Sequence, residues 1–331
     1  MQRRFARCGR DIKRRARRRQ YENMYWRSVA AVLIFGIGAA EATEWEAAGK
    51  QWWKHVEYLA SDQLEGRQPG SSGYEKAAGY VAAQFDEAGL KPVLNGSYFQ
   101  QVEFTQTSLD ASKSSLSLVR NGQTFAVPVP MEALLGYSAD SAASLEAPVV
   151  FAGYGLSIPE AHWDDLAGLG VKGAVVAFLT GGPDKIDGNL CSHYSSTEER
   201  WKAFRAAGAV GMIAIPDPKT MEIPWSRTAL SWGEPHMSLA DSSLSATRGL
   251  KFSAYWNPAE ADDLLADSGH KFAQILDAAH GQQQLPRFRL ASSMKATVSI
   301  SNKNITSKNV CGLRAGEDPK LKDEYVVISA H

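Results

Sequence analysis

Two short apolar runs on either side of a helical pattern constrain the fold of this chain most. Residues 173–179 and 210–215 are continuous apolar runs bounded by turn residues, which is typical of buried strands. Between them, residues 197–207 carry Trp201 and Phe204 on one helical face, and the pattern stops at Gly208. This strand–helix–strand succession predicts an α/β unit rather than a pure β-sandwich.

Composition and charge exclude several classes of protein. The 331 residues are 44% apolar and 22% charged, close to the globular average, which excludes disordered, collagen-like and coiled-coil proteins. The net charge of zero hides an uneven distribution, because eleven of the 36 basic residues but three of the 36 acidic residues fall within residues 1–42. The remaining chain therefore has a net charge of about −8, which argues against a protein that binds nucleic acid.

The amino-terminal 42 residues predict an export signal. Residues 29–40 form an uncharged apolar run, and Ala40-Glu41-Ala42 is the small-x-small pattern that signal peptidase reads. We expect cleavage after Ala42 and a periplasmic or extracellular protein, with a short membrane anchor or a buried helix as alternatives. The run is shorter than the roughly 18–20 residues that span a bilayer, so no stable transmembrane span is expected. Met24 opens a signal of ordinary length, which indicates that residues 1–23 belong to a misassigned start codon.

Two helices are expected after this signal. Apolar residues recur at helical spacing over residues 44–60, and a second helix over residues 72–88 begins with Ser72 and Glu75 as a capping box and stops at Gly89. Three tryptophans are expected to pack the first helix: Trp45, Trp52 and Trp53.

The carboxyl-terminal third predicts two further helices and a final strand. Helices are expected over residues 258–267 and 270–280, the first with Asn257 as its cap. Strands are expected over residues 296–300 and near 309–314. The apolar residues 325–330 predict a last buried strand with His331 at its carboxyl end.

Several of these segments, in this order, resemble one enzyme family. Residues 58–67 (YLASDQLEGR) and the helix that ends in GLKP at 89–92 resemble the opening of exported di-zinc aminopeptidases. These are the clan MH metallopeptidases, relatives of glutamate carboxypeptidase II and the transferrin receptor. Residues 309–312 (NVCG) and 324–331 (EYVVISAH) resemble the two strands that lead into the zinc site of that family. The resemblance covers nearly all of residues 45–331.

A second set of motifs resembles the protease-associated (PA) domain that is inserted in many of these enzymes. The motifs are VFAGYG at 150–155, WDDL at 163–166, VKG at 171–173 and AAGAVGMI at 206–213. The resemblance implies the amino-terminal helices of a peptidase α/β/α domain over residues 43–119 and a PA insert over 120–285. The first strands of the peptidase sheet, which is then incomplete, would follow over residues 286–331. We expect the insert to fold on its own.

The resemblance also implies a metal ligand. In that family the histidine that ends this strand is the first ligand of a pair of zinc ions, which matches His331. The bridging aspartate, the glutamate pair with the general base, a further aspartate and a distant histidine would all follow position 331. Because a two-metal hydrolase needs these groups, we expect no catalytic residue within the 331 residues and no stable zinc pair bound by them. A truncated product or a shortened gene model would explain this.

Two functions from different classes follow. The resemblance implies a zinc-dependent aminopeptidase, a hydrolase that releases amino-terminal residues from peptides, here as an amino-terminal fragment that is inactive alone. The alternative is a non-catalytic protein in which the PA domain binds a protein or peptide, as the transferrin receptor branch illustrates.

Other residue patterns favour structural roles. Cys191 and His193 lack a second pair at zinc-finger spacing, and the pairing of Cys191 with Cys311 is left open. Glu65-Gly66-Arg67 is expected to lock the helix junction, with substrate contact as the alternative. The acidic pairs Asp164-Asp165 and Asp262-Asp263 are expected in a turn and on an exposed helix face. The remaining histidines are expected at the surface or at helix caps: His55, His162, His236, His270 and His280.

Overall fold

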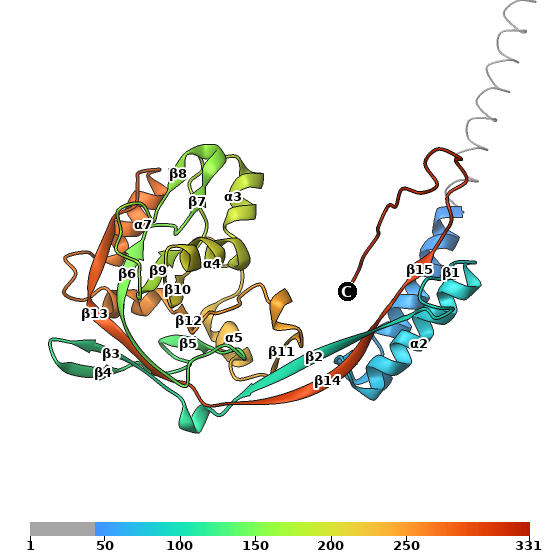
Figure 1. Ribbon diagram of the computed structural model, residues 1–331, viewed down its shortest axis with the longest axis horizontal. Helices are drawn as coiled ribbons and strands as arrows, with labels where there is room; N and C mark the ends of the chain where they lie inside the picture. The colour runs from blue at the N-terminus through green and yellow to red at the C-terminus, as the bar shows by residue number, and fades with distance from the viewer. Residues whose placement is uncertain (1–43) are drawn as a thin grey trace, which may run out of the picture. The chain divides into compact units, whose positions relative to one another are not determined.

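The computed structural model describes residues 44–331, which form two compact units (Figure 1). The smaller unit combines residues 44–93 with residues 312–331, and the larger unit comprises residues 94–311. The expected export signal, with its cleavage after Ala42 and the start at Met24, lies outside the described residues. None of the described helices is long and apolar enough to cross a membrane.

An eight-stranded mixed sheet organises the larger unit, with the order β4-β3-β13-β6-β9-β10-β12-β5. Four neighbouring strands are parallel to one another: β6 (Ser144–Ala152), β9 (Val175–Leu179), β10 (Gly211–Ile215) and β12 (Phe252–Trp256). The others pair antiparallel: β3 (Ser115–Arg120), β4 (Gln123–Ala126), β5 (Ala133–Gly136) and β13 (Arg287–Thr297).

Both faces of this sheet are buried. Side chains of β9 alternate between two cores, with Val175 in one and Val176 in the other. Helix α4 (Thr197–Ala206) inserts Trp201 and Phe204 into the second core. Helices α6 (Ala261–Leu264) and α7 (Phe272–His280) pack into the first core, on the opposite face. The expected α/β class is therefore confirmed, with β9, α4 and β10 beginning or ending within about two residues of the expected bounds.

One expected helix is broken. Residues 258–267 form a 3₁₀ turn, η6 (Pro258–Glu260), followed by the single turn of α6. The left-handed backbone at Asp267 (φ 61°) and Gly269 (φ 80°) separates this segment from α7, because an α-helix requires negative φ. Asn257 caps the turn as expected, since its side chain accepts the N–H of Ala259.

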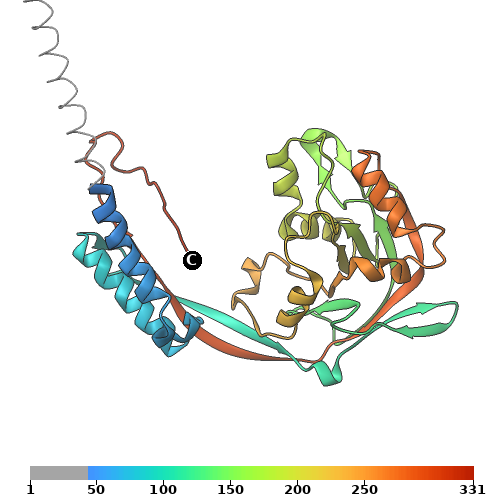
Figure 2. The ribbon, with the colours of Figure 1, turned by 180° about the vertical axis from the view of Figure 1, so that it is seen from behind.

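A second, three-stranded antiparallel sheet also belongs to the larger unit. Its long strands, β2 (Phe99–Leu109) and β14 (Ile300–Val310), pair along their whole length (Figure 2). The short strand β11 (His236–Leu239) pairs with β2. The remaining short elements of this unit are η2 (Ala111–Lys113), β7 (Ser157–Ile158), η3 (Pro159–Ala161), β8 (Trp163–Asp164), α3 (Gly188–Tyr194), α5 (Trp225–Thr228), η4 (Ala229–Ser231) and η5 (Ser242–Leu244).

The larger unit extends beyond the expected insert at both ends. Strand β13 begins after residue 285 and β3 ends at residue 120, yet both pair within the eight-stranded sheet. The expected bounds of the inserted domain, residues 120 and 285, therefore stay a prediction. The compact unit of the structure runs from residue 94 to residue 311.

The smaller unit consists of helices and one short strand pair. A helix over residues 44–59 is followed by η1 (Asp62–Arg67) and α2 (Ser72–Glu87). Strand β1 (Lys91–Pro92) pairs antiparallel with β15 (Gly312–Leu313). This pair of strands thus joins the segment that precedes the larger unit in the sequence to the segment that follows it.

The start of α2 differs from the expected one by one residue, and a glycine near this start allows η1 to pack closely on the helix. The cap is Ser71, whose Oγ accepts the N–H of Tyr74 at 3.1 Å, so the expected capping box of Ser72 and Glu75 begins one residue too late. A Cβ at Gly73 would lie 1.9 Å from the carbonyl oxygen of Leu64, so only glycine allows this approach of η1 to α2. The helix ends at Gly89 (φ 73°) as expected.

Two expectations for the smaller unit are wrong. Trp45, Trp52 and Trp53 do not pack the helix but are 77%, 62% and 53% exposed. Residues 325–330 form no strand, and Ile328 is 94% exposed. An apolar run becomes a buried strand only where neighbouring strands bond its backbone, and no described strand pairs with this segment.

Candidate functional site

The expected zinc ligand, His331, lies at the end of this exposed segment. Across residues 44–331, no three His, Cys, Asp or Glu side chains gather in a group that could hold a metal ion. Zinc requires three or four ligands, so a single exposed imidazole does not fit a zinc site by itself. The role of His331 therefore stays a prediction, and no reaction step is derived through a metal.

A polar pocket lies instead at the carboxyl edge of three parallel strands in the larger unit. Tyr154 follows β6, Gly181 and Gly182 follow β9, and Asp217 follows β10. His280, the last residue of α7, also lines the pocket, which has a volume of about 220 Å³. The carboxyl ends of parallel strands are where open α/β sheets bind their ligands.

A double-glycine turn positions Tyr154. Gly153 and Gly155 have φ values of 59° and 63°, a backbone conformation that glycine adopts without strain. A Cβ at Gly155 would lie 2.8 Å from the ring of Phe204 and 3.0 Å from Cβ of Phe178. The turn after β6 therefore requires glycine, and it places the tyrosine between the sheet and the pocket.

Tyr154 is almost wholly buried, and its hydroxyl group has no hydrogen-bond partner among the described residues. The residue is 6% exposed, and within residues 44–331 no group forms a hydrogen bond with its hydroxyl. Burial and, to a lesser extent, the negative charges of Asp184 and Asp217 together raise its pKa to about 12. At neutral pH the hydroxyl is uncharged and lies in a negative potential.

Asp217 and His280 form a fixed pair in the wall of the pocket. Nε2 of His280 lies 2.8 Å from Oδ2 of Asp217, which is 7% exposed. The other carboxylate oxygen of Asp217 accepts the backbone N–H of Lys219 at 2.9 Å. Both oxygens are thus engaged, so the pair holds α7 and the loop after β10 in place.

Asp184 and Gln282 form a second pair at the mouth. The amide nitrogen of Gln282 donates to Oδ2 of Asp184 at 2.6 Å, and the backbone N–H of Asp184 donates to the amide oxygen at 3.2 Å. Lys219 is exposed at the same mouth and, in the described part of the chain, forms no ion pair. The mouth therefore carries one carboxylate and one ammonium group.

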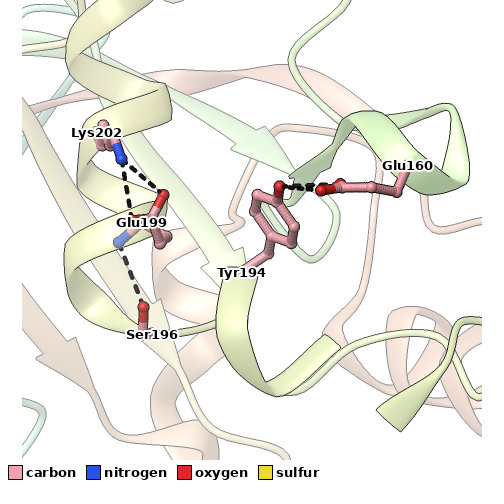
Figure 3. Close-up of polar contacts among 5 residues, drawn as sticks. All are labelled: Glu160, Tyr194, Ser196, Glu199 and Lys202. Atoms are coloured by element: carbon pink, nitrogen blue, oxygen red, sulfur yellow. Dashed lines mark hydrogen bonds and ion pairs between the residues drawn. The ribbon is translucent and has the colours of Figure 1, made fainter. Parts of the chain in front are cut away.

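Polar contacts among η3, α3 and α4 are ordinary surface interactions (Figure 3). The hydroxyl of Tyr194 donates to the carboxylate of Glu160, with distances of 3.0 and 2.9 Å to its two oxygens. Ser196 caps α4 by accepting the N–H of Glu199, whose carboxylate pairs with Lys202 at 3.1 Å. None of these residues lines the pocket.

The other histidines and the cysteines take structural positions. Cys191 and Cys311 are free thiols. His55 bonds Tyr80 at 2.7 Å, and His280 bonds Asp217, so neither is a bare surface residue. Ring contacts or turn geometry account for the rest: His193 with Tyr194, His236 with Tyr137, His270 with Phe288, and His162 with a left-handed φ of 50°.

The acidic pairs and the Glu65–Arg67 segment also have local roles. Asp165 is buried and accepts the N–H of Leu156, and burial raises the pKa of its carboxyl group. Asp262 accepts the N–H of Phe272 at the start of α7. Glu65, Gly66 and Arg67 all have positive φ (47°, 78° and 56°), which turns the chain sharply between the two helices.

Sequence reasoning missed the pocket, although its signal was present. Tyr154, Gly181 and Asp217 each come within two residues of the end of an apolar run. Because parallel strands bring their carboxyl ends to one edge, polar or glycine residues in these places mark a site. His280 carries no such signal, because it lies 63 residues from its partner Asp217.

Comparisons with known proteins find similarity only among solved structures, and at low sequence identity. No protein-family model matches the sequence, and no curated protein matches it. Among solved structures, the chain is similar to an aminopeptidase from Aneurinibacillus sp. strain AM-1, with 17% identity and a TM-score of 0.38, over 82% of this chain and 49% of that one. It is also similar to a zinc aminopeptidase from Bacillus subtilis, with 17% identity and a TM-score of 0.33, over 81% of this chain and 47% of that one.

The chain therefore spans about half the length of these aminopeptidases. A TM-score below 0.5 does not establish a shared fold, so these similarities carry no argument for the function proposed next.

Proposed function

We propose that this chain is part of an exported zinc-dependent aminopeptidase, a hydrolase that acts on the free amino terminus of peptides. In this proposal, the smaller unit belongs to the peptidase domain, the larger unit is an inserted PA domain, and His331 is the first zinc ligand. The ordered motifs from residue 58 to His331 support this reading of the chain.

The discontinuity of the smaller unit is the observation that supports the proposal most. Residues 44–93 and 312–331 form one compact unit, and the 218 residues between them form another. The pairing of Lys91 with Leu313 and Pro92 with Gly312 closes the smaller unit at the point of insertion. A domain inserted in this way is what the PA motifs within residues 150–213 imply.

The experiment compares two lengths of the protein. The nucleotide sequence after the codon for His331 is read first, and an open frame that encodes an aspartate two residues later supports the proposal. The longer protein is then assayed with zinc on aminoacyl-p-nitroanilides beside the 331-residue chain. We expect chelator-sensitive turnover by the longer protein, loss of that turnover in its His331→Ala variant, and background rates from the 331-residue chain. Turnover that survives His331→Ala would contradict the role of the histidine.

A binding function is the second candidate, and the pocket favours it. The pocket is built wholly from residues of the larger unit, so it does not depend on the peptidase site. A stop codon after His331 together with a stable exported product would favour this second candidate.

A further inference from the structure

The pocket at the carboxyl edge of β6, β9 and β10 has the properties of a binding site for a small zwitterion. It contains a buried tyrosine whose hydroxyl has no partner within residues 44–331, and its mouth carries groups of both charges. We propose that this pocket binds a free α-amino acid with a small side chain. The proposal rests on the pocket itself and does not require the aminopeptidase function.

The ammonium group of the ligand is assigned to Asp184 and Tyr154. Asp184 pairs with the neutral amide of Gln282, so its negative charge remains uncompensated. The hydroxyl oxygen of Tyr154 forms no hydrogen bond within residues 44–331, so it is free to accept one from a ligand in the pocket. The nearby charges of Asp184 and Asp217 make the surroundings of this hydroxyl negative, as its raised pKa indicates. A cation is stabilised in such a place, and an anion is repelled.

The carboxylate of the ligand is assigned to Lys219. Lys219 lines the pocket and is exposed, and no described acidic side chain pairs with its ammonium group. A ligand with an ammonium group alone would leave Lys219 unpaired, and a ligand with a carboxylate alone would face Asp184. A zwitterion matches both groups, because charge-assisted hydrogen bonds form at each end.

Size and lining restrict the side chain of the ligand. The pocket has a volume of about 220 Å³, and Ala279 is the one residue of its lining whose side chain is wholly apolar. A large apolar side chain would find no matching surface there. A metal ion is disfavoured because both oxygens of Asp217 are already engaged and Asp184 alone supplies too few ligands.

The first experiment uses three small probes on the full chain. L-alanine, N-acetyl-L-alanine and ethylamine are titrated by isothermal calorimetry, since the second lacks the ammonium group and the third lacks the carboxylate. We expect saturable binding of L-alanine and binding at least about tenfold weaker for each of the other two, the effect of losing one charge-assisted contact. The absence of saturable L-alanine binding, or equal affinity for either analogue, would overturn the proposal.

The second experiment uses matched variants. Tyr154→Phe removes the free hydroxyl, Asp184→Asn removes the carboxylate charge, and Lys219→Met removes the ammonium group. Three controls remove the same groups from the surface contacts of Figure 3: Tyr194→Phe, Glu160→Gln and Lys202→Met.

We expect Asp184→Asn and Lys219→Met to weaken L-alanine binding by about tenfold or more, and Tyr154→Phe by about fivefold. The controls should bind as the unaltered protein does. Thermal unfolding of each variant verifies that it is folded, and Asp184 and Lys219 are exposed enough to be replaced without loss of the fold. Equal losses in the pocket variants and the controls, or no loss in the folded pocket variants, would overturn the proposal.

Discussion

The two units of this chain bury very different amounts of apolar side chain. The larger unit encloses Trp201, Trp256 and Phe151, each at most 1% exposed, on both faces of its sheet. In the smaller unit, the buried apolar residues of the described chain are Leu64 and the alanines Ala77, Ala78 and Ala82. Since hydrophobic stabilisation follows the area removed from water, the larger unit holds most of the stability of the chain.

The smaller unit shows the opposite arrangement, with its large apolar residues outside. Trp45, Trp52 and Trp53 are exposed, and so are Val326 and Ile328. Its order depends on local devices: the Ser71 cap, the Gly73 approach, and the stacking of Tyr58 on Tyr80 at 4.1 Å. The comparison teaches that helical periodicity alone does not secure burial, because a helix buries its apolar stripe only where a second surface covers it.

The largest expected effect concerns the bounds of the independent unit. A protein of residues 94–311 keeps β3, β13 and the long β2–β14 pair, whereas a protein of residues 120–285 loses β13, which pairs with β6. We expect the first to unfold cooperatively on heating. For residues 120–285, which the sequence alone predicts to fold independently, the loss of β13 leads us to expect a poorly dispersed NMR spectrum instead. A dispersed spectrum from residues 120–285 would show that the four parallel strands suffice without β13.

A smaller effect is expected from removing one tryptophan in each unit. Trp201→Ala opens a cavity beneath α4 and removes the hydrogen bond from its indole N–H to the carbonyl of Arg248. We expect a loss of about 3–5 kcal/mol in the free energy of unfolding, measured with urea. The control, Trp52→Ala, removes an exposed side chain and should change it by less than about 0.5 kcal/mol. Similar losses would mean that Trp52 is covered in solution.

Alanine at a glycine in each unit gives an intermediate effect. Gly155→Ala combines a φ of 63° with contact against Phe204 and Phe178, so we expect a loss of about 2–4 kcal/mol. Gly66→Ala has a similar φ of 78° but open space around the added methyl group, so about 1–2 kcal/mol is expected. Urea unfolding curves of both variants measure the difference, and equal losses would contradict a packing contribution at Gly155.

Substitutions in the exposed apolar segment 325–330 are expected to have the smallest effect on stability but a measurable effect on self-association. Val326→Lys with Ile328→Lys places charges on residues that are 93% and 94% exposed. We expect the urea midpoint to stay unchanged while self-association, measured by light scattering, decreases, because exposed apolar segments promote contact between chains. Unchanged scattering would mean that association arises elsewhere, for example at Trp45 and Trp52.

The parts of the fold that the sequence predicted are those fixed by local patterns. The strands β9 and β10 and the helix α4 are short, strongly patterned and punctuated by Gly173 and Gly208. The strand expected over residues 325–330 has the same pattern but lacks a pairing neighbour among the described strands. Whether such an apolar segment forms a strand depends on a neighbouring strand elsewhere in the chain, and the residues of the segment alone do not show whether that neighbour exists.

The candidate site also has one part that the local sequence predicts and another part that depends on the folded sheet. The double-glycine turn around Tyr154 follows from local sequence, since a turn after a buried strand favours glycine. The pairs Asp217–His280 and Asp184–Gln282 join residues 63 and 98 positions apart, and only the folded sheet brings them together. The sequence therefore marks the turns that follow the three strands, whereas the two side-chain pairs in the wall and at the mouth of the pocket can be found only in the folded protein.

The short strand pair β1–β15 has a consequence for how this protein is built and how it can be rebuilt. Pro92 and Gly312 are register partners, so the chain leaves the smaller unit and returns to it at adjacent positions. A tight turn joining these positions would bypass the whole larger unit without lengthening any connection in the smaller one. Inserted domains of different length can therefore be exchanged at this junction. Each replacement needs only two chain ends that lie one strand spacing apart, as Phe99 of β2 and Val310 of β14 do.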